Sequence, residues 1–229
     1  MEITSQNFKE NVKTALQNQE LQSALKKSRS GFVDKRKIAV HALNEFEMLR
    51  KRAATIKNHV LAHLDQYLMQ YEESVIQAGG HVHWASTPQQ GVKIIQGICL
   101  KADAKYVTKG KSMIGEEMDL NHALEEIGMD VVETDLGEYI IQLAEERPSH
   151  IIAPAIHKTR NQITDLFFEH HAKHGITEKV EEVSAIVNEA RTVLREQFVR
   201  ADVGITGANF LIADSGSCLL YTSPSPRDS

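Results

Sequence analysis

The stretch RADVGITGANFLIADSGS, residues 200–217, decides the fold that we expect for this chain of 229 residues. Apolar Val203 and Ile205 predict a strand, and the run FLIA at 210–213 predicts a second one. Gly207 lies in the turn between them, where glycine permits backbone angles that other residues avoid. We expect this pair of strands to complete a sheet that begins earlier in the chain, near its middle or at one edge.

The last twelve residues, CLLYTSPSPRDS at 218–229, look unlike the rest of the chain. Their codons can be written as the transposase adapter that is ligated to fragments in shotgun sequencing libraries. We therefore expect this segment to be non-native and exclude it from fold reasoning. A natural tail rich in Pro and Ser is the alternative. On the first interpretation the native sequence continues past Ser217 in a longer protein.

Charge and cysteine content narrow the classes of function. The net charge of −5 does not suggest a nucleic-acid binder. The first 60 residues hold 12 Lys and Arg against 6 Asp and Glu, which indicates either a surface for an acidic partner or a solvated helical face. No apolar run approaches the roughly 18 residues that a membrane helix needs. Cys99 is the only cysteine before residue 218, so we expect no disulfide and a cytoplasmic location.

The spacing of apolar residues predicts an α/β fold with long N-terminal helices and a mainly parallel sheet. Residues 5–78 have a helical pattern, and Gly79 and Gly80 end it. We expect 1–78 to be a helical lead-in packed on an α/β domain at 79–217. Predicted strands lie at 81–85, 104–108, 129–134 and 150–156, and they alternate with helices from 87, at 120–128 and at 139–146.

Two helix starts are marked by capping sequences. Thr87 and Thr159 each stand three residues before a glutamine, as in a capping box. Two long helices are predicted at 159–173 and 178–200. The second has one apolar face, formed by Val180, Val183, Val187, Ala190, Leu194 and Phe198.

Loops that leave the strands are the places to look for a ligand site, because ligands bind at the carboxyl ends of strands in open parallel sheets. In TKGKSMIGEE, residues 108–117, two lysines flank a glycine and could attract an anion, or the loop is a solvated turn. Its Gly-Lys-Ser resembles the end of a P-loop, but Lys105 stands where that motif needs glycine. In ETDLGEY, residues 133–139, the carboxylates of Asp135 and Glu138 are either a base or ligand, or a helix cap with its partner.

Histidines provide the remaining candidates. His157 follows a predicted strand, where it could be an acid, a base, a ligand or a hydrogen-bonded structural residue. The clusters at 59–63 and 170–174 have spacings that suit metals, but we favour solvent-facing histidines and expect no metal site. The candidate ligand-binding residues are Lys111, Ser112, Thr134, Asp135, Glu138, His157, Thr206, Gly207 and Asn209.

Three segments in this order resemble one known family. They are KSMIGEEMDLN at 111–121, VVETDLGEYIIQLAEERPSHIIAPAIHK at 131–158 and ADVGITGANFLIADSGS at 201–217. They are similar to the lactate utilization protein B family, and the resemblance extends over residues 8–217. It implies a LUD domain, whose fold is similar to the NagB/RpiA/CoA-transferase group.

The resemblance also implies a role for the longer protein. In the family a ferredoxin-like module with two CxxCxxCxxxCP runs follows and binds two [4Fe–4S] clusters. The whole protein is then an iron–sulfur electron-transfer component, which acts with two partner proteins in oxidising L-lactate to pyruvate. Each cluster needs about four thiolates, so we expect no cluster in these residues and no electron transfer by this fragment alone.

Two hypotheses remain for the LUD part. It either docks and positions the cluster module and the partner subunits, or it is itself a ligand-binding or CoA-transferase-like domain that acts on a small anionic substrate. A catalytic CoA-transferase is expected to carry an activated glutamate in a glycine-rich loop. Glu138 stands next to Gly137, but a helix cap explains that arrangement more simply. Fold analogy alone does not choose between the hypotheses.

Overall fold

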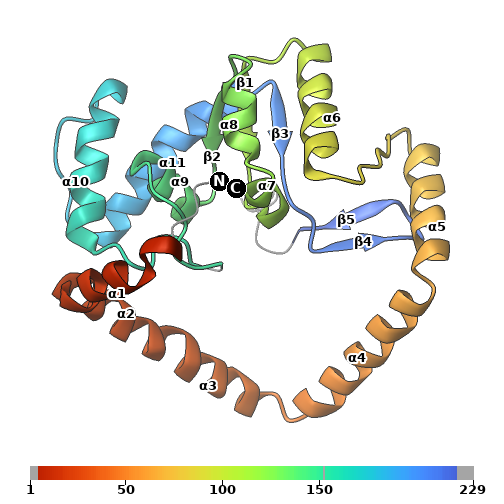
Figure 1. Cartoon of the computed structure of the whole chain (residues 1–229), viewed down its shortest axis with the longest axis horizontal. Helices are drawn as coiled ribbons and strands as arrows, with labels where there is room; N and C mark the ends of the chain where they lie inside the picture. Colours follow the sequence, from red (N-terminus) through yellow and green to blue (C-terminus); the bar gives the residue numbers. More distant parts are fainter. Residues whose placement is uncertain (1–4, 152, 221–229) are drawn as a thin grey trace. The chain divides into compact units, whose positions relative to one another are not determined.

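A computed structural model of the chain describes residues 5–151 and 153–220 and confirms the α/β fold with a parallel sheet and long N-terminal helices (Figure 1). Among the described residues no helix is both long and apolar enough to cross a membrane. The N-terminal elements are η1 (Ser5–Asn7), α1 (Phe8–Gln17), α2 (Gln19–Arg29), η2 (Ser30–Asp34), α3 (Lys35–Ala42), α4 (Phe46–Ala62) and α5 (Leu64–Gln77).

The rest of the chain carries the strands and the helices that alternate with them. These elements are α6 (Pro88–Lys101), β1 (Tyr106–Lys109), α7 (Met113–Glu117), α8 (Leu120–Glu125), β2 (Asp130–Glu133), α9 (Leu136–Leu143), α10 (Arg160–His171), η3 (Ala172–His174), α11 (Val183–Arg200), β3 (Val203–Ile205), β4 (Phe210–Ile212) and β5 (Ser217–Leu219).

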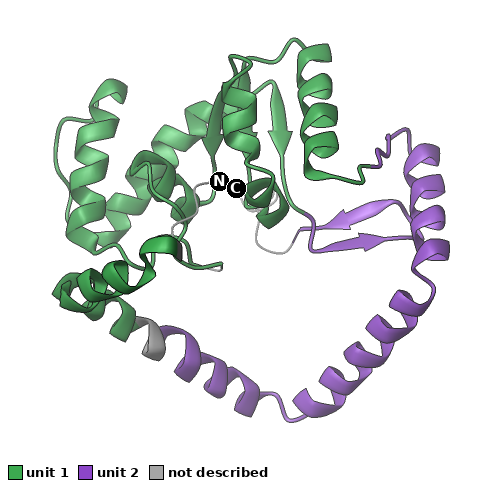
Figure 2. Ribbon diagram, in the orientation of Figure 1, with its two compact units in different colours: residues 1–27, 85–207, 222–229 green, residues 28–84, 208–221 purple. Residues whose placement is uncertain are grey.

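The described residues divide into two compact units that are discontinuous in sequence (Figure 2). One unit contains residues 5–27, 85–151 and 153–207, and the other contains 28–84 and 208–220. The chain therefore leaves the second unit at 84 and returns to it at 208. This division differs from the expected lead-in at 1–78 and domain at 79–217. Of the segment expected to be non-native, residues 221–229 lie outside the described residues, whereas β5 includes Cys218 and Leu219.

Three parallel strands form the sheet of the first unit, in the order β2-β1-β3. Lys109 at the end of β1 is aligned with Glu133 at the end of β2 and with Ile205 at the end of β3. The carboxyl ends of all three strands therefore lie at one edge of the sheet. Because β2 is an edge strand, its free backbone groups need other partners. Gln142 of α9 supplies them, accepting from Glu133 N at 2.9 Å and donating to Val131 O at 2.7 Å.

Successive side chains of a strand point to opposite faces of the sheet, and an apolar cluster covers each face. Val107 and Val131 are buried against α6 and α8, together with Cys99, Leu120, Leu124 and Met129. A second cluster joins α9, α10 and α11 through Tyr139, Ile140, Phe167, Ile186, Ala190, Val193 and Leu194. Val132, the neighbour of Val131, packs against this second cluster. Burying each large apolar side chain contributes about 1.5–3 kcal/mol, so the two clusters hold the strands and helices together.

The stretch at 200–217 joins the beginnings of the three parallel strands. Asp202 Oδ2 accepts hydrogen bonds from the backbone amides of Lys105 and Tyr106 at 2.8 and 2.9 Å. Arg200 lies over the ring of Tyr106 at 4.3 Å and reaches Asp130 at 2.6 Å. The amides that bond to Asp202 lower its pKa. One short segment before β3 therefore fixes the starts of β1 and β2.

Our expectation for the strands of this stretch is wrong in one respect. β3 pairs with β1, whereas β4 pairs antiparallel with β5 and belongs to the other unit. The two strands are therefore not partners in one sheet. Turn residues between two apolar runs predict a change of direction, but they do not determine which backbone each run will pair with.

Two other predicted strands are absent from the described residues. Residues 81–85 form no strand, and the indole of Trp84 donates to Glu72 in α5. Residues 150 and 151 form a bend, residue 153 has no regular structure, and residues 154–156 form a turn. Pro154 lacks a backbone donor, which disfavours a ladder there, and it lies against Gly137, where an added Cβ would be 2.9 Å from its Cγ.

Helix boundaries and faces also differ in places. α11 begins at Val183 rather than near 178, and its buried face is formed by Ile186, Ala190, Val193, Leu194 and Gln197. Val183 and Phe198, predicted on that face, are 58% and 44% exposed. The capping box at Thr159 is confirmed in full. Thr87 accepts from Gln90 N, but Gln90 bonds back to Ser86 N.

Candidate ligand-binding site

The alternation of strand side chains places one lysine and one glutamate at the carboxyl edge of the sheet. Lys109 follows Val107 by two residues and Glu133 follows Val131 by two, so both turn to the face that α8 covers. Lys109 Nζ lies 2.6 Å from Glu133 Oε1, and the two side chains are 1% and 6% exposed. Asn121 at the start of α8 donates to the same carboxylate oxygen at 2.7 Å.

A second ion pair lies at the same edge. Lys111 Nζ is 2.5 Å from Glu138 Oε1, and the Glu138 side chain is buried in the first turn of α9. Both lysines of the glycine-containing loop therefore face a carboxylate. The positive charge that the sequence suggested for an anion is compensated within the protein.

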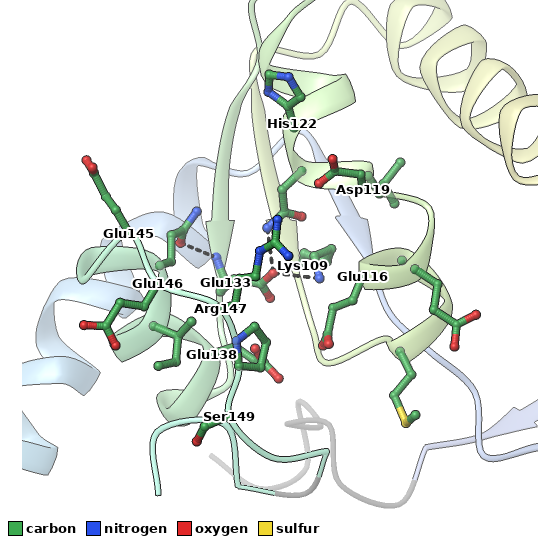
Figure 3. A pocket seen from close by; sticks show the side chains of 18 of the residues that line it. Lys109, Glu116, Asp119, His122, Glu133, Glu138, Glu145, Glu146, Arg147 and Ser149 are labelled. Carbon is green, nitrogen blue, oxygen red and sulfur yellow. Dashed lines mark hydrogen bonds and ion pairs between the residues drawn. The ribbon is translucent and has the colours of Figure 1, made fainter. Parts of the chain in front are cut away.

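A cavity of about 830 Å³ opens above these residues. Figure 3 shows Lys109 and Glu133 side by side in it, with Glu116 on α7 and Arg147 on the segment after α9. The described residues that line it include eight Asp and Glu side chains, but only two Lys and Arg side chains. Its volume is within the range of small-molecule sites. Its charge favours a ligand that is not an anion.

Several buried polar atoms in this cavity have no hydrogen-bond partner among the described residues. They are Lys109 Nζ, Glu116 Oε1, Asn121 Oδ1 and Glu133 Oε2. Lys109 Nζ is in ion-pair contact with Glu133 Oε1 at 2.6 Å, and in the described part of the chain no acceptor is placed for its other hydrogens. All four residues line the one cavity. Because buried polar groups are nearly always paired, such a cluster calls for a partner from outside the protein.

The loop residues around the cavity have local roles that the hydrogen bonds make clear. Ser112 caps α7 by accepting from Gly115 N at 3.1 Å. Asp135 caps α9 by accepting from the amides of Gly137 and Glu138 at 3.1 and 3.4 Å. Thr134 donates to Lys109 O at 3.1 Å. These three candidates therefore hold in place the loops that follow the strands. Of the nine candidate residues, Glu138 lines the cavity directly.

The turn after β3 lies against the loop after β1. A Cβ added to Gly207 would be 3.0 Å from Lys111 O and 3.2 Å from Ser112 Cα. Thr206 Oγ1 donates to Gly207 O at 3.4 Å. Glycine is therefore required at 207 for close approach of two backbone segments, and not for an unusual backbone angle.

Two candidates lie apart from this cluster. His157 bonds to Ser149 Oγ and to Glu146 Oε2, both at 2.7 Å, and Lys158 also pairs with Glu146. Burial opposes ionisation of Glu146, but the hydrogen bonds from Lys158 and His157 prevail and lower its pKa. Asn209 belongs to the other unit, where its backbone amide donates to the backbone carbonyl of Leu219 at 3.0 Å.

The expectation of solvent-facing histidines is wrong for His171, whose side chain is fully buried. Its Nδ1 lies 2.7 Å from Glu189 Oε1 and its Nε2 lies 3.0 Å from the Tyr139 hydroxyl. Burial lowers the pKa of His171 although Glu189 opposes this, and burial raises the pKa of Tyr139 to about 12. The imidazole is thus neutral, donating to Glu189 and accepting from Tyr139, and it serves the core.

Comparison of the sequence with known proteins identifies the family of this chain. Residues 68–229 match the family model described as LUD domain, which is well over half of the chain. The chain belongs to the LUD domain family. No solved structure matches it significantly.

Two relatives of this LUD chain carry the same description. It is 44% identical over 231 residues to "Lactate utilization protein B" of Lysinibacillus sphaericus (strain C3-41), covering 100% of this chain and 47% of the relative. It is 42% identical over 231 residues to the protein of the same name from Bacillus pumilus (strain SAFR-032), covering 100% and 48%. The LUD chain spans about half the length of the curated relatives that it matches.

Two carboxyls of the LUD cavity, those of Glu116 and Glu133, have raised pKa values. Burial raises the pKa of Glu116, as does nearby Glu138, although Lys111 and Lys109 act in the opposite direction. Burial also raises the pKa of Glu133 and outweighs the effects of Lys109 and Asn121. A carboxyl with a raised pKa exchanges a proton more readily near neutral pH. The LUD site can therefore bind polar groups and supply or accept a proton.

Sequence reasoning missed Asn121 and Glu133 and did not single out Glu116. A sequence signal existed for one pair, although the predicted strands at 104–108 and 129–134 both ended at a threonine. In the observed strands β1 (YVTK) and β2 (DVVE), a charged residue follows the buried valine by two positions. Two aligned parallel strands place such residues side by side. Nothing in the sequence indicated that α7 and α8 would bring Glu116 and Asn121 to the same point of the LUD cavity.

Proposed function

We propose that this LUD chain is the N-terminal part of a lactate utilization protein B, an iron–sulfur electron-transfer component of a system that oxidises L-lactate to pyruvate. The observation that supports this role is the 42–44% identity, over the whole chain, to relatives with that name. Its partners are the other proteins of the same system.

The clusters belong to a part of the protein outside these 229 residues. A [4Fe–4S] cluster needs about four thiolates, and the sequence contains two cysteines, Cys99 and Cys218. Cys99 is buried in α6, where burial raises the pKa of its thiol. A buried thiol of this kind acts as a packing residue rather than as a ligand.

A chimera tests the role in lactate oxidation. Residues 1–217 replace the corresponding half of the Bacillus pumilus relative in a strain that lacks its own lactate utilization protein B. We expect growth on L-lactate to be restored, with growth on glucose as the control. A chimera that accumulates and binds iron, but does not support growth on lactate when the intact relative does, would refute the proposal.

Iron content tests the assignment of the clusters separately. The 229-residue chain is reconstituted anaerobically with iron and sulfide, and iron is counted after treatment with a chelator. We expect no stoichiometric iron and no broad visible absorption of a cluster. Chelator-resistant iron on this chain would contradict the proposal that the clusters lie elsewhere.

A second candidate function is that the LUD domain itself binds a small molecule. The observation in its favour is the cavity at the carboxyl edge of the sheet, with its cluster of unpaired buried polar atoms. This function and the role in lactate oxidation are compatible. The alternative of a small anionic substrate is disfavoured by the eight carboxylates that line the cavity.

A further inference from the structure

The unpaired atoms of the cavity define what a ligand must offer. Among the described residues, Glu133 Oε2, Glu116 Oε1 and Asn121 Oδ1 are acceptors without donors, and Lys109 Nζ has no acceptor besides the carboxylate of Glu133. The Lys109 and Glu133 side chains are more than nine-tenths buried. A matching ligand therefore brings several hydrogen-bond donors and at least one acceptor to a small region.

Hydroxyl groups meet this requirement without adding charge. Each hydroxyl has one donor hydrogen and acceptor lone pairs, so it can serve Glu133 or Asn121 and also accept from Lys109. Removing the penalty of unpaired buried groups is the source of affinity. A cavity of about 830 Å³ is large enough for a molecule that carries several hydroxyls.

Charged ligands fit less well. An anion would approach eight carboxylates and only two lysine and arginine side chains. An ammonium group placed at Glu133 would stand beside the buried ammonium of Lys109, which already lies 2.6 Å from that carboxylate. A metal ion is also disfavoured, because within the described residues no three His, Cys, Asp or Glu side chains are placed to hold one.

We propose that the cavity formed by Lys109, Glu116, Asn121 and Glu133 binds a neutral polyhydroxylated small molecule, a sugar or polyol without a phosphate group. The inference rests on the second candidate function, that the LUD domain binds a small molecule. It does not depend on the role in lactate oxidation, which the chimera tests by growth.

Three probes with one skeleton separate hydroxyl recognition from charge recognition. Binding to the 229-residue chain is measured by calorimetry for D-glucose, D-glucose 6-phosphate and D-glucosamine, with myo-inositol as a second neutral probe. We expect a neutral probe to bind with a dissociation constant on the order of 1 mM, and we expect the phosphate and the ammonium to weaken binding. Tighter binding of either charged probe, or no neutral probe binding below about 10 mM, overturns the proposal.

One substitution distinguishes a ligand site from a structural group. Glu116→Met removes an unpaired acceptor while keeping a side chain of similar length, so the melting temperature should stay the same or rise. Affinity for the neutral probe should fall about tenfold or more, because a buried hydrogen bond is lost. Glu169→Met, at an exposed position on α10 that does not line the cavity, is the matched control and should leave affinity unchanged.

A second measurement keeps the test decisive if Glu116→Met fails to fold. The side-chain amide of Asn121 is followed in nitrogen-edited NMR spectra of the unsubstituted chain as D-glucose or myo-inositol is added. We expect this resonance to shift with the affinity that calorimetry gives. Binding that leaves the Asn121 amide unperturbed, or unchanged affinity in Glu116→Met, places the ligand elsewhere and overturns the assignment.

Discussion

Lys109 and Glu133 illustrate how a single pair of residues combines stability and function. Each is the last residue of its strand, and each compensates the charge of the other, which burial removes from water. A buried ion pair contributes little net stability, because desolvation offsets the attraction. Removing one partner is far more costly, because the other charge is left buried and uncompensated.

The first prediction concerns this pair. Lys109→Met should lower the free energy of unfolding by about 3–5 kcal/mol, since Glu133 is left without its cation. The double variant Lys109→Met/Glu133→Gln should recover most of this loss and still offer an acceptor to Asn121. Urea unfolding followed by circular dichroism measures both. Lys101→Met, at an exposed position, is the control, and a single-variant loss below about 1 kcal/mol would contradict the argument.

The second prediction concerns the pH dependence that His171 introduces. Its folded pKa is lowered from the usual 6.5 because burial disfavours the imidazolium, although Glu189 acts in the opposite direction. Below that value the unfolded state binds more protons, so stability should fall as the pH decreases from about 7 to about 5. His171→Gln should reduce the slope, and urea unfolding at several pH values measures it.

Exposed His41 provides the matched control for this experiment. His41→Gln should leave the dependence of the unfolding free energy on pH unchanged. A parent chain and a His171→Gln variant with the same slope would show that the buried imidazole is not the group responsible.

At the scale of elements, helix caps place the loops that surround the cavity. Asp135 accepts from two amides at the start of α9, and this helix carries Glu138 into its ion pair with Lys111. Ser112 accepts from the amide of Gly115 at the start of α7, and this helix carries Glu116. The site therefore depends on where two helices begin as much as on the strands.

The third prediction tests the cap of α9. Asp135→Ala should lower the free energy of unfolding by about 1 kcal/mol, because two amides lose their acceptor. Asp135→Asn should retain most of the stability, since its side-chain oxygen can still cap. Thermal unfolding measures both variants. Equal losses in the two variants would indicate that the negative charge matters, rather than the cap.

At the scale of the whole chain, burial is distributed unequally between the N-terminal helices and the sheet with the helices around it. Among the described residues, helices α1, α3, α4 and α5 contain no buried residue. β1, β2 and the helices around them contain the apolar clusters. Local opening should therefore be far easier in the N-terminal helices than in the sheet.

The fourth prediction is a pattern of hydrogen exchange. Backbone amides of α3 to α5 should exchange rapidly, whereas the amides of Val131 and Val107 should be among the best protected in the chain. Exchange followed by mass spectrometry of peptides measures this. Comparable protection in the N-terminal helices and in β1 would contradict it and would indicate burial of those helices in an assembly.

The sequence alone was sufficient for features that depend on neighbours along the chain. The N-terminal helices, the strands at 104–108 and 129–134 and the capping box at Thr159 follow from periodicity and local hydrogen bonding. The expectation that ligand residues lie at strand exits also follows from the order of strands and helices. The resemblance over three ordered segments identified the LUD family.

Tertiary structure alone decided which distant residues meet. Local patterns favour a strand at 210–213, but only the available backbone edges determine that it pairs with 217–219 rather than with 203–205. Lys109 and Glu133 are far apart in sequence and come together because two strands are parallel and in register. Asn121 and Glu116 join them because short helices cross the edge of the sheet. Burial, which leaves these polar atoms unpaired, is a property of the assembled layers and has no signature in any single segment.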